Sequence, residues 1–177
     1  KNNKNFIIFS GSYEYKPNAY SIDQLIKFIM PNLHKIEPDI ELLILGNENL
    51  EYSEPWLKFE KVSKNKYLNY LSNAIAIVIP SNESYGSKVK IIEALCYGTP
   101  VITTKTGFTG INIINKLQPS IESNNRSIIK KIIKIKNSRD KYYQAAKNVK
   151  KHYIRMHDIN LNIKRFIKRL ESLWLQT

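Results

Sequence analysis

The chain has 177 residues, 42% of them hydrophobic and 11% aromatic, which fits one globular domain and excludes a disordered chain or a fibrous repeat. A single cysteine, Cys96, excludes a disulfide framework and a four-cysteine zinc site. The net charge of +13, from 28 basic and 15 acidic residues, favours polyanionic or phosphorylated partners but does not choose among them.

Apolar segments that predict strands alternate with amphipathic segments that predict helices. The predicted strands span residues 5–11, 40–46, 56–62, 74–80, 100–104 and 119–123. The predicted helices span residues 18–36, 64–74, 87–98, 125–136, 138–152 and 158–175. Within the first helix, Pro31 is expected to kink the helix or end it early.

This alternation predicts an α/β fold, a Rossmann-like doubly wound parallel sheet of about six strands with helices on both faces. We expect residues 1–177 to form a single domain in which residues 125–177 are mostly helical and form a C-terminal tail. In such sheets ligands bind beyond the carboxyl ends of the strands, so the loops that follow the strands are the candidate sites.

The loop after the first predicted strand reads GSYEYKPN. Gly11 allows the backbone to turn sharply and to approach a ligand closely. The helix that follows points its N-terminus at the same crevice, where an anion is stabilised. A plain strand-to-helix turn explains the same residues, so this loop alone does not decide the function.

The stronger feature follows the most hydrophobic predicted strand and reads SNESYGSKVKIIEALCYG. Gly86 and Glu93 are seven residues apart and therefore share one helix face. Helix amides near Ser87 and Lys88 would face an anion, and the Glu93 carboxylate would accept hydrogen bonds from a diol behind it. This pattern favours a nucleotide, with its phosphate and ribose. The alternative is an ion pair between Glu93 and Lys90 on a solvated helix face.

Three stretches in order, FSGSYEYKPN, IELLILG and AIAIVIPSNESYGSKVKIIEALCYGTPVITTKTGFTGI, resemble the C-terminal, donor-binding half of retaining nucleotide-sugar glycosyltransferases. These are GT-B enzymes of the glycosyl transferases group 1 family. Identifiable motifs cover residues 5–111. The last stretch resembles the family pattern G-x-K-x-K-x-x-E-A-x-x-x-G-x-P-V-[IV] through Lys88, Lys90, Glu93, Ala94, Gly98, Pro100 and Val101.

The resemblance implies a donor site assembled from several loops. Backbone amides at the start of helix 87–98 hold the diphosphate, the glutamate of that helix binds the ribose, and the first-loop glycine lies near the transferred sugar. The base rests against the loop after the third strand. The residues implied are Gly11, Val62, Gly86, Ser87, Lys88 and Glu93.

The sequence departs from the family pattern at two places. Many relatives have an arginine directly after the first-loop glycine, where Ser12 stands here, and Lys16 is the candidate to supply that charge. Many relatives also have a second glutamate eight positions before Glu93; Tyr85 occupies that position, which leaves Glu83 as its substitute. Lys88 is then the predicted cation that stabilises the leaving diphosphate.

The expected activity is transfer of a hexosyl group from a nucleoside-diphosphate sugar to a glycan or similar acceptor, in polysaccharide biosynthesis. The resemblance implies a metal-independent enzyme, and the sequence contains no D-x-D motif and no metal-binding histidine spacing. The acceptor-binding N-terminal domain of the family is absent from these residues, so we expect them to bind nucleotide-sugar donor without turnover. The alternative is a basic α/β module that binds nucleic acid without catalysis. The tyrosines are scattered along the sequence and do not form the stacking pattern of a nucleic-acid-binding sheet, so no nucleic-acid partner is expected.

No apolar run reaches the roughly eighteen residues of a membrane span, and a cytoplasmic protein is expected. The last predicted helix carries an apolar stripe opposite a basic face. Such a helix either lies on an anionic membrane, as a peripheral contact, or packs on its own domain or on the missing N-terminal domain.

Overall fold

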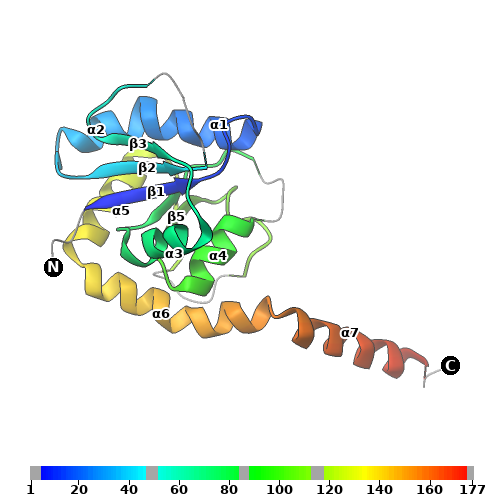
Figure 1. Cartoon of the computed structure of the whole chain (residues 1–177). Helices are drawn as coiled ribbons and strands as arrows, with labels where there is room; N and C mark the ends of the chain where they lie inside the picture. Colours follow the sequence, from blue (N-terminus) through cyan, green and yellow to red (C-terminus); the bar gives the residue numbers. More distant parts are fainter. Residues whose placement is uncertain (1–4, 47–51, 84–87, 113–117, 175–177) are drawn as a thin grey trace.

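The computed structural model describes residues 5–46, 52–83, 88–112 and 118–174 (Figure 1). These residues contain a six-stranded sheet of order β3-β2-β1-β4-β5-β6, in which every neighbouring pair is parallel. This is the order of a doubly wound fold and confirms the predicted class. The strands are β1 (Phe6–Ser10), β2 (Glu41–Leu45), β3 (Leu57–Glu60), β4 (Ile77–Ile79), β5 (Val101–Thr104) and β6 (Ser120–Glu122).

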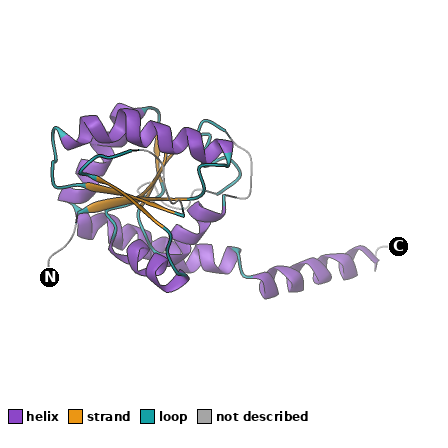
Figure 2. Ribbon diagram, turned by 45° about the horizontal axis from the view of Figure 1, so that its top comes forward, coloured by secondary structure: helices purple, strands orange, loops and turns teal. Residues whose placement is uncertain are grey.

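Helices cover both faces of this sheet (Figure 2). One layer contains α5, which packs against η1, β5 and β6; in the other, α4 packs against α3, β5 and α6. The helical elements are α1 (Lys16–Asp23), the π-helix η1 (Gln24–Ile29), α2 (Met30–His34), α3 (Lys64–Asn73), α4 (Val89–Tyr97), α5 (Asn125–Asn137), α6 (Arg139–Met156) and α7 (Ile159–Trp174).

The core lies between the sheet and these two helix layers. The central strands β1 and β4 are almost wholly apolar because both faces of a parallel sheet are covered, and Ile7, Ile8 and Ile77 have no exposed surface. The order of the strands reverses between β1 and β4. The loops after these two strands therefore lie side by side at one edge of the sheet, which is where ligands bind in such folds.

The first long helical segment differs from the prediction. It continues past Pro31 to His34, so the expectation that this proline ends the helix early is wrong. A proline inside a helix lacks an amide hydrogen and crowds the carbonyl four residues earlier. The π-helical stretch η1 directly precedes it and shifts the backbone hydrogen bonds, so the helical path accommodates the proline.

The last helix, α7, projects away from the rest of the domain (Figure 1). Its apolar side chains are exposed, with Ile159 at 71% and Phe166 at 63% of their surface. The predicted helical C-terminal tail is confirmed. Among the described residues, no helix combines the length and apolarity that a membrane crossing requires.

The central strand tests how strongly this core stabilises the fold. Ile8 is fully buried in β1, so Ile8→Ala removes core packing and should lower the free energy of unfolding by about 2–5 kcal/mol. Ile36→Ala makes the same change at a side chain that is 61% exposed and should stay within about 0.5 kcal/mol of wild type. Urea denaturation of both variants gives the comparison, and equal losses would contradict this core.

Candidate functional site

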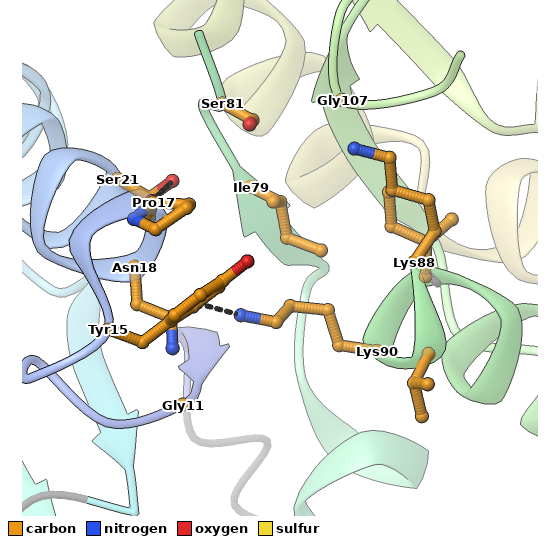
Figure 3. Close-up of a pocket in the computed structure, with 12 residues that line it drawn as sticks. Gly11, Tyr15, Pro17, Asn18, Ser21, Ile79, Ser81, Lys88, Lys90 and Gly107 are labelled. Atoms are coloured by element: carbon orange, nitrogen blue, oxygen red, sulfur yellow. Dashed lines mark hydrogen bonds between the residues drawn. The ribbon is translucent and has the colours of Figure 1, made fainter. Parts of the chain in front are cut away.

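Two adjoining pockets lie at the carboxyl ends of the strands. The first, of about 360 Å³, lies between the β1–α1 loop, the end of β4 and the start of α4 (Figure 3). The second, of about 480 Å³, lies between the ends of β1 and β2, the β3–α3 loop and the same start of α4. Gly11, Val89 and Lys90 line both, so the two pockets meet at these residues.

Gly11 has a φ of +141°, a backbone conformation that residues with a side chain rarely adopt. Its amide donates to the Leu45 carbonyl at 2.9 Å, which fixes the turn after β1. A Cβ atom at this position would lie 2.5 Å from Asn18 Nδ2 and 3.0 Å from Lys90 Nζ. The missing side chain therefore allows the polar ends of Asn18 and Lys90 to lie against the backbone where the pockets meet.

The start of α4 lies two residues later than predicted. Lys88 has a left-handed backbone (φ 54°) and is the N-cap, so the first helical residue is Val89. For a residue other than glycine this conformation costs about 1–2 kcal/mol. The helix begins by bonding Ile91 and Ile92 to the Lys88 carbonyl, at 2.9 and 3.1 Å. The predicted diphosphate contacts Gly86 and Ser87 lie outside the described residues.

Lys90 extends from the first turn of α4 across the place where the pockets meet. Its Nζ donates to Asn18 Oδ1 at 2.5 Å and lies 4.3 Å from the centre of the Phe9 ring. Burial, and then the positive charge of Lys88, lowers the pKa of Lys90 to about 8. No carboxylate of the described residues forms an ion pair with this lysine.

Lys88 lies beside the first pocket, on a different side from Lys90. Its Nζ donates to the Glu83 carbonyl at 3.3 Å, and Figure 3 shows its amine towards Gly107. Burial lowers the pKa of Lys88. The two lysines of the K-x-K sequence therefore reach different parts of the first pocket.

Glu93 lines the second pocket together with Val62 and Tyr67. Burial raises the pKa of the Tyr67 phenol above its ordinary value, and the negative charge of Glu93 adds to this effect. The hydrogen bond with Ser10 acts in the opposite direction and offsets it only in part. The Tyr67 hydroxyl also lies 3.4 Å from Ser10 Oγ. Glu93 and Lys90 do not form the ion pair considered from their spacing. The carboxylate instead lies in the pocket, on the Tyr67 side.

Ser12 and Lys16 are not among the described residues that line either pocket. The Ser12 carbonyl accepts from Asn18 Nδ2 at 2.9 Å, and its hydroxyl accepts from the Glu14 amide at 3.2 Å. Lys16 is exposed at the first position of α1. Ser12 therefore contributes to the first pocket only indirectly, because its carbonyl positions the Asn18 side chain that lines the pocket.

The far wall of the first pocket comes from β4 and from the loop after β5. The Gly107 amide donates to Thr104 Oγ1 at 3.0 Å, and that hydroxyl donates to the Ser81 carbonyl. A Cβ atom on Gly107 would lie 2.3 Å from Thr103 Oγ1, so the loop packs closely on β5. Sequence reasoning did not single out this wall, Asn18 or Lys90 as pocket residues. The described residues hold no cluster of side chains suited to a metal ion.

A family model of the glycosyl transferases group 1 matches residues 4–136, which contain all the described residues that line the two pockets. The chain belongs to the glycosyl transferases group 1 family. This confirms the resemblance drawn from the three sequence stretches. None of the curated proteins matches the chain.

Solved structures share the fold of this group 1 domain at low sequence identity. TarM has a TM-score of 0.74 at 14% identity, with 94% of this chain and 35% of TarM covered. Sucrose-phosphate synthase from Thermosynechococcus elongatus has a TM-score of 0.72 at 18% identity, with 96% and 46% covered. HepE from Anabaena, in complex with UDP-glucose, has 0.68 at 16% identity, with 97% and 49% covered. This chain therefore spans less than half the length of each.

Lys90 makes the stability of this group 1 domain depend on pH. Its lowered pKa means that the fold disfavours the ammonium, so between about pH 8 and 10.5 the unfolded chain binds more protons. The free energy of unfolding therefore rises with pH through that window, because the fold no longer has to hold a buried ammonium once Lys90 is neutral. Relative to Lys90→Met, wild type should gain about 1–3 kcal/mol in unfolding free energy between about pH 7 and pH 10. Urea denaturation of both proteins measures this, and parallel pH curves would contradict it.

Proposed function

We propose that this chain is the donor-nucleotide-binding domain of a glycosyltransferase that moves a hexosyl group from a nucleoside-diphosphate sugar to a glycan or similar acceptor. One observation carries the proposal: two connected pockets at the strand ends, with a carboxylate in one and a lysine ammonium where they meet. Membership of the group 1 family supports it, as does the likeness to HepE, which holds UDP-glucose.

The nucleoside fits the second pocket. Its base would rest against Val62, after β3, and its ribose hydroxyls would donate to the Glu93 carboxylate. The diphosphate would then lie where the pockets meet, between Gly11 and the start of α4, and the sugar would extend into the first pocket. Each pocket has the size of an ordinary small-molecule site, about 300–1,000 Å³.

Transfer requires stabilisation of the negative charge that develops on the leaving diphosphate. The α4 N-terminus offers backbone amides and the positive end of the helix dipole, and Lys88 adds a cation at the wall of the first pocket. Gly86 and Ser87 remain predicted contributors. We propose that these groups replace a metal ion, because preorganised donors and cations provide the same electrostatic stabilisation.

The acceptor and the complete active site belong to the rest of a longer protein in this proposal. Residues 1–177 act as one domain that binds donor but does not turn it over, and a missing N-terminal domain supplies the acceptor site. The expected acceptor is a glycan made in the cytoplasm for polysaccharide biosynthesis. No observation favours the nucleic-acid alternative, since the pockets are concave and built for a small ligand.

The exposed apolar face of α7 is the surface that we assign to that missing domain. Ile163 and Phe166 are 51% and 63% exposed, although a helix of this kind normally buries its apolar stripe. Since the similar chains are about twice as long or longer, a second domain in the full-length protein could cover it. An anionic membrane is the alternative cover.

Glu93→Ala tests the nucleotide assignment. A hydrogen bond to a charged acceptor contributes about 1.5–3 kcal/mol. Its loss should therefore weaken binding of the preferred nucleotide among UDP, GDP and ADP roughly 10–100-fold. Calorimetric titration with UDP, GDP and ADP measures this and identifies the base. Glu14→Ala, at an exposed residue outside both pockets, is the matched control and should bind as wild type. Wild-type affinity in Glu93→Ala would refute the ribose role, and no nucleotide binding by wild type at millimolar concentration would refute the proposed function.

Liposome sedimentation distinguishes whether the apolar face of α7 contacts the missing domain or an anionic membrane. The basic chain will attract anionic vesicles through its charge, so the assay is run at about 0.3 M salt, where such attraction is screened. We expect the double variant Ile163→Ser, Phe166→Ser to co-sediment with phosphatidylglycerol vesicles to the same extent as wild type. A large loss of co-sedimentation in the variant would identify α7 as a membrane contact instead.

A further inference from the structure

Lys90 is held in an unusual setting for a lysine. The ammonium lies against an amide oxygen and an aromatic ring, at 2.5 Å from Asn18 Oδ1 and 4.3 Å from the Phe9 ring centre. Both contacts are favourable for a cation, but neither carries a full negative charge. Among the residues that the structure describes, no carboxylate forms an ion pair with this directed amine.

Asn18 fixes the position of this amine. Its Nδ2 donates to the Ser12 carbonyl at 2.9 Å, so its Oδ1 faces Lys90. An amide oxygen accepts a hydrogen bond from a neutral amine as well as from an ammonium. Figure 3 shows this hydrogen bond between Asn18 and Lys90. Because the amide oxygen accepts from either form of the amine, the contact holds Lys90 Nζ in place in both protonation states.

The charges around Lys90 are mainly positive. On its own helix the neighbours are Lys88 at the N-cap and Glu93 one turn later. The β3–α3 segment brings Lys61, Lys64 and the Tyr67 phenol to the second pocket, and the β1–α1 loop brings the Tyr15 phenol to the first. From the β4–α4 loop, Glu83 presents its carbonyl to Lys88. Glu93 is therefore the carboxylate among these pocket-lining groups.

We propose that Lys90 is a second cation, besides Lys88, that meets the leaving diphosphate, and that donor binding strengthens the binding of a proton at its Nζ. The inference rests on the proposed function. The diphosphate supplies a counter-charge, so the ammonium stays the favoured form up to a higher pH. The proton comes from solvent, no bond other than N–H forms, and the Asn18 contact is retained as one of the three ammonium donors.

This assignment separates the roles of the two lysines. Lys88 Nζ is directed to the Glu83 carbonyl and to the Gly107 side of the first pocket, where the transferred sugar would lie. Lys90 Nζ is directed to the pocket junction, beside Gly11, where the diphosphate would lie. A free-protein pKa near 8 for Lys90 makes proton uptake measurable at ordinary pH.

The experiment is a pH titration of the lysine side chains by NMR, with and without UDP. In protein labelled with ¹³C at lysine Cε, the Lys90 signal is assigned by its absence from Lys90→Arg. We expect it to titrate near pH 8 in the free protein and to move above about pH 10 when UDP is bound. Titration of the free protein at the ordinary lysine value, or a pKa that bound UDP leaves unchanged, would overturn the proposal.

Affinity gives a second readout. If proton uptake accompanies binding, the Kd of UDP should rise about tenfold from pH 7 to pH 9. Lys90→Arg, which stays charged, should lose this difference from pH 7 to 9, and Lys88→Arg should keep it. Equal pH dependence in all three proteins would overturn the role of Lys90. Failure of the wild-type protein to bind UDP, GDP or ADP would instead refute the proposed function. The NMR titration of the free protein would still test whether the pKa of Lys90 is lowered.

Discussion

The hydrogen bond between Lys90 and Asn18 joins residues 72 positions apart and depends on the order of the sheet. It forms because β1 and β4 are neighbours, paired at Ile8 and Ile77, with the strand order reversing between them. The loop after β1 and the helix after β4 therefore meet at one edge. Gly11 and the first turn of α4, which line both pockets, are brought together by that reversal.

The strands and helices follow from local sequence, whereas their exceptions arise from neighbouring geometry. Nearly uninterrupted apolar runs predict β1, β2 and β4, because strands inside a parallel sheet are covered on both faces, whereas the edge strand β3 (LKFE) alternates and is only partly buried. Pro31 follows the general rule that proline interrupts α-helical hydrogen bonds, but η1 absorbs the interruption and the helix continues. Nothing in the sequence of that segment distinguishes a π-helical turn from a helix end.

The residues of the candidate site likewise divide into those that local sequence could identify and those that depend on distant neighbours. Gly11 could be singled out because a glycine at the end of a strand indicates a backbone turn, here with a positive φ, and Glu93 because it matches the glutamate of the family pattern. Lys90 could not, because helical spacing pairs it with Glu93 whereas its partner comes from a distant loop. The left-handed Lys88 likewise has no sequence signal, since such backbone positions normally carry glycine.

The basic composition has a local meaning at this edge of the sheet. Lys61, Lys64 and Lys88 raise the positive potential around the pockets, which attracts a phosphorylated ligand. Burial, and then the charge of Lys88, disfavours a further positive charge on Lys90. The charge of Lys88 thus has opposite effects on a phosphorylated ligand and on Lys90. In the proposed complex, the negative charge of the diphosphate would offset the repulsion between these two lysines. In the proposal, donor binding and the charge of Lys90 are therefore coupled by electrostatic interactions of the same kind as those that attract the donor.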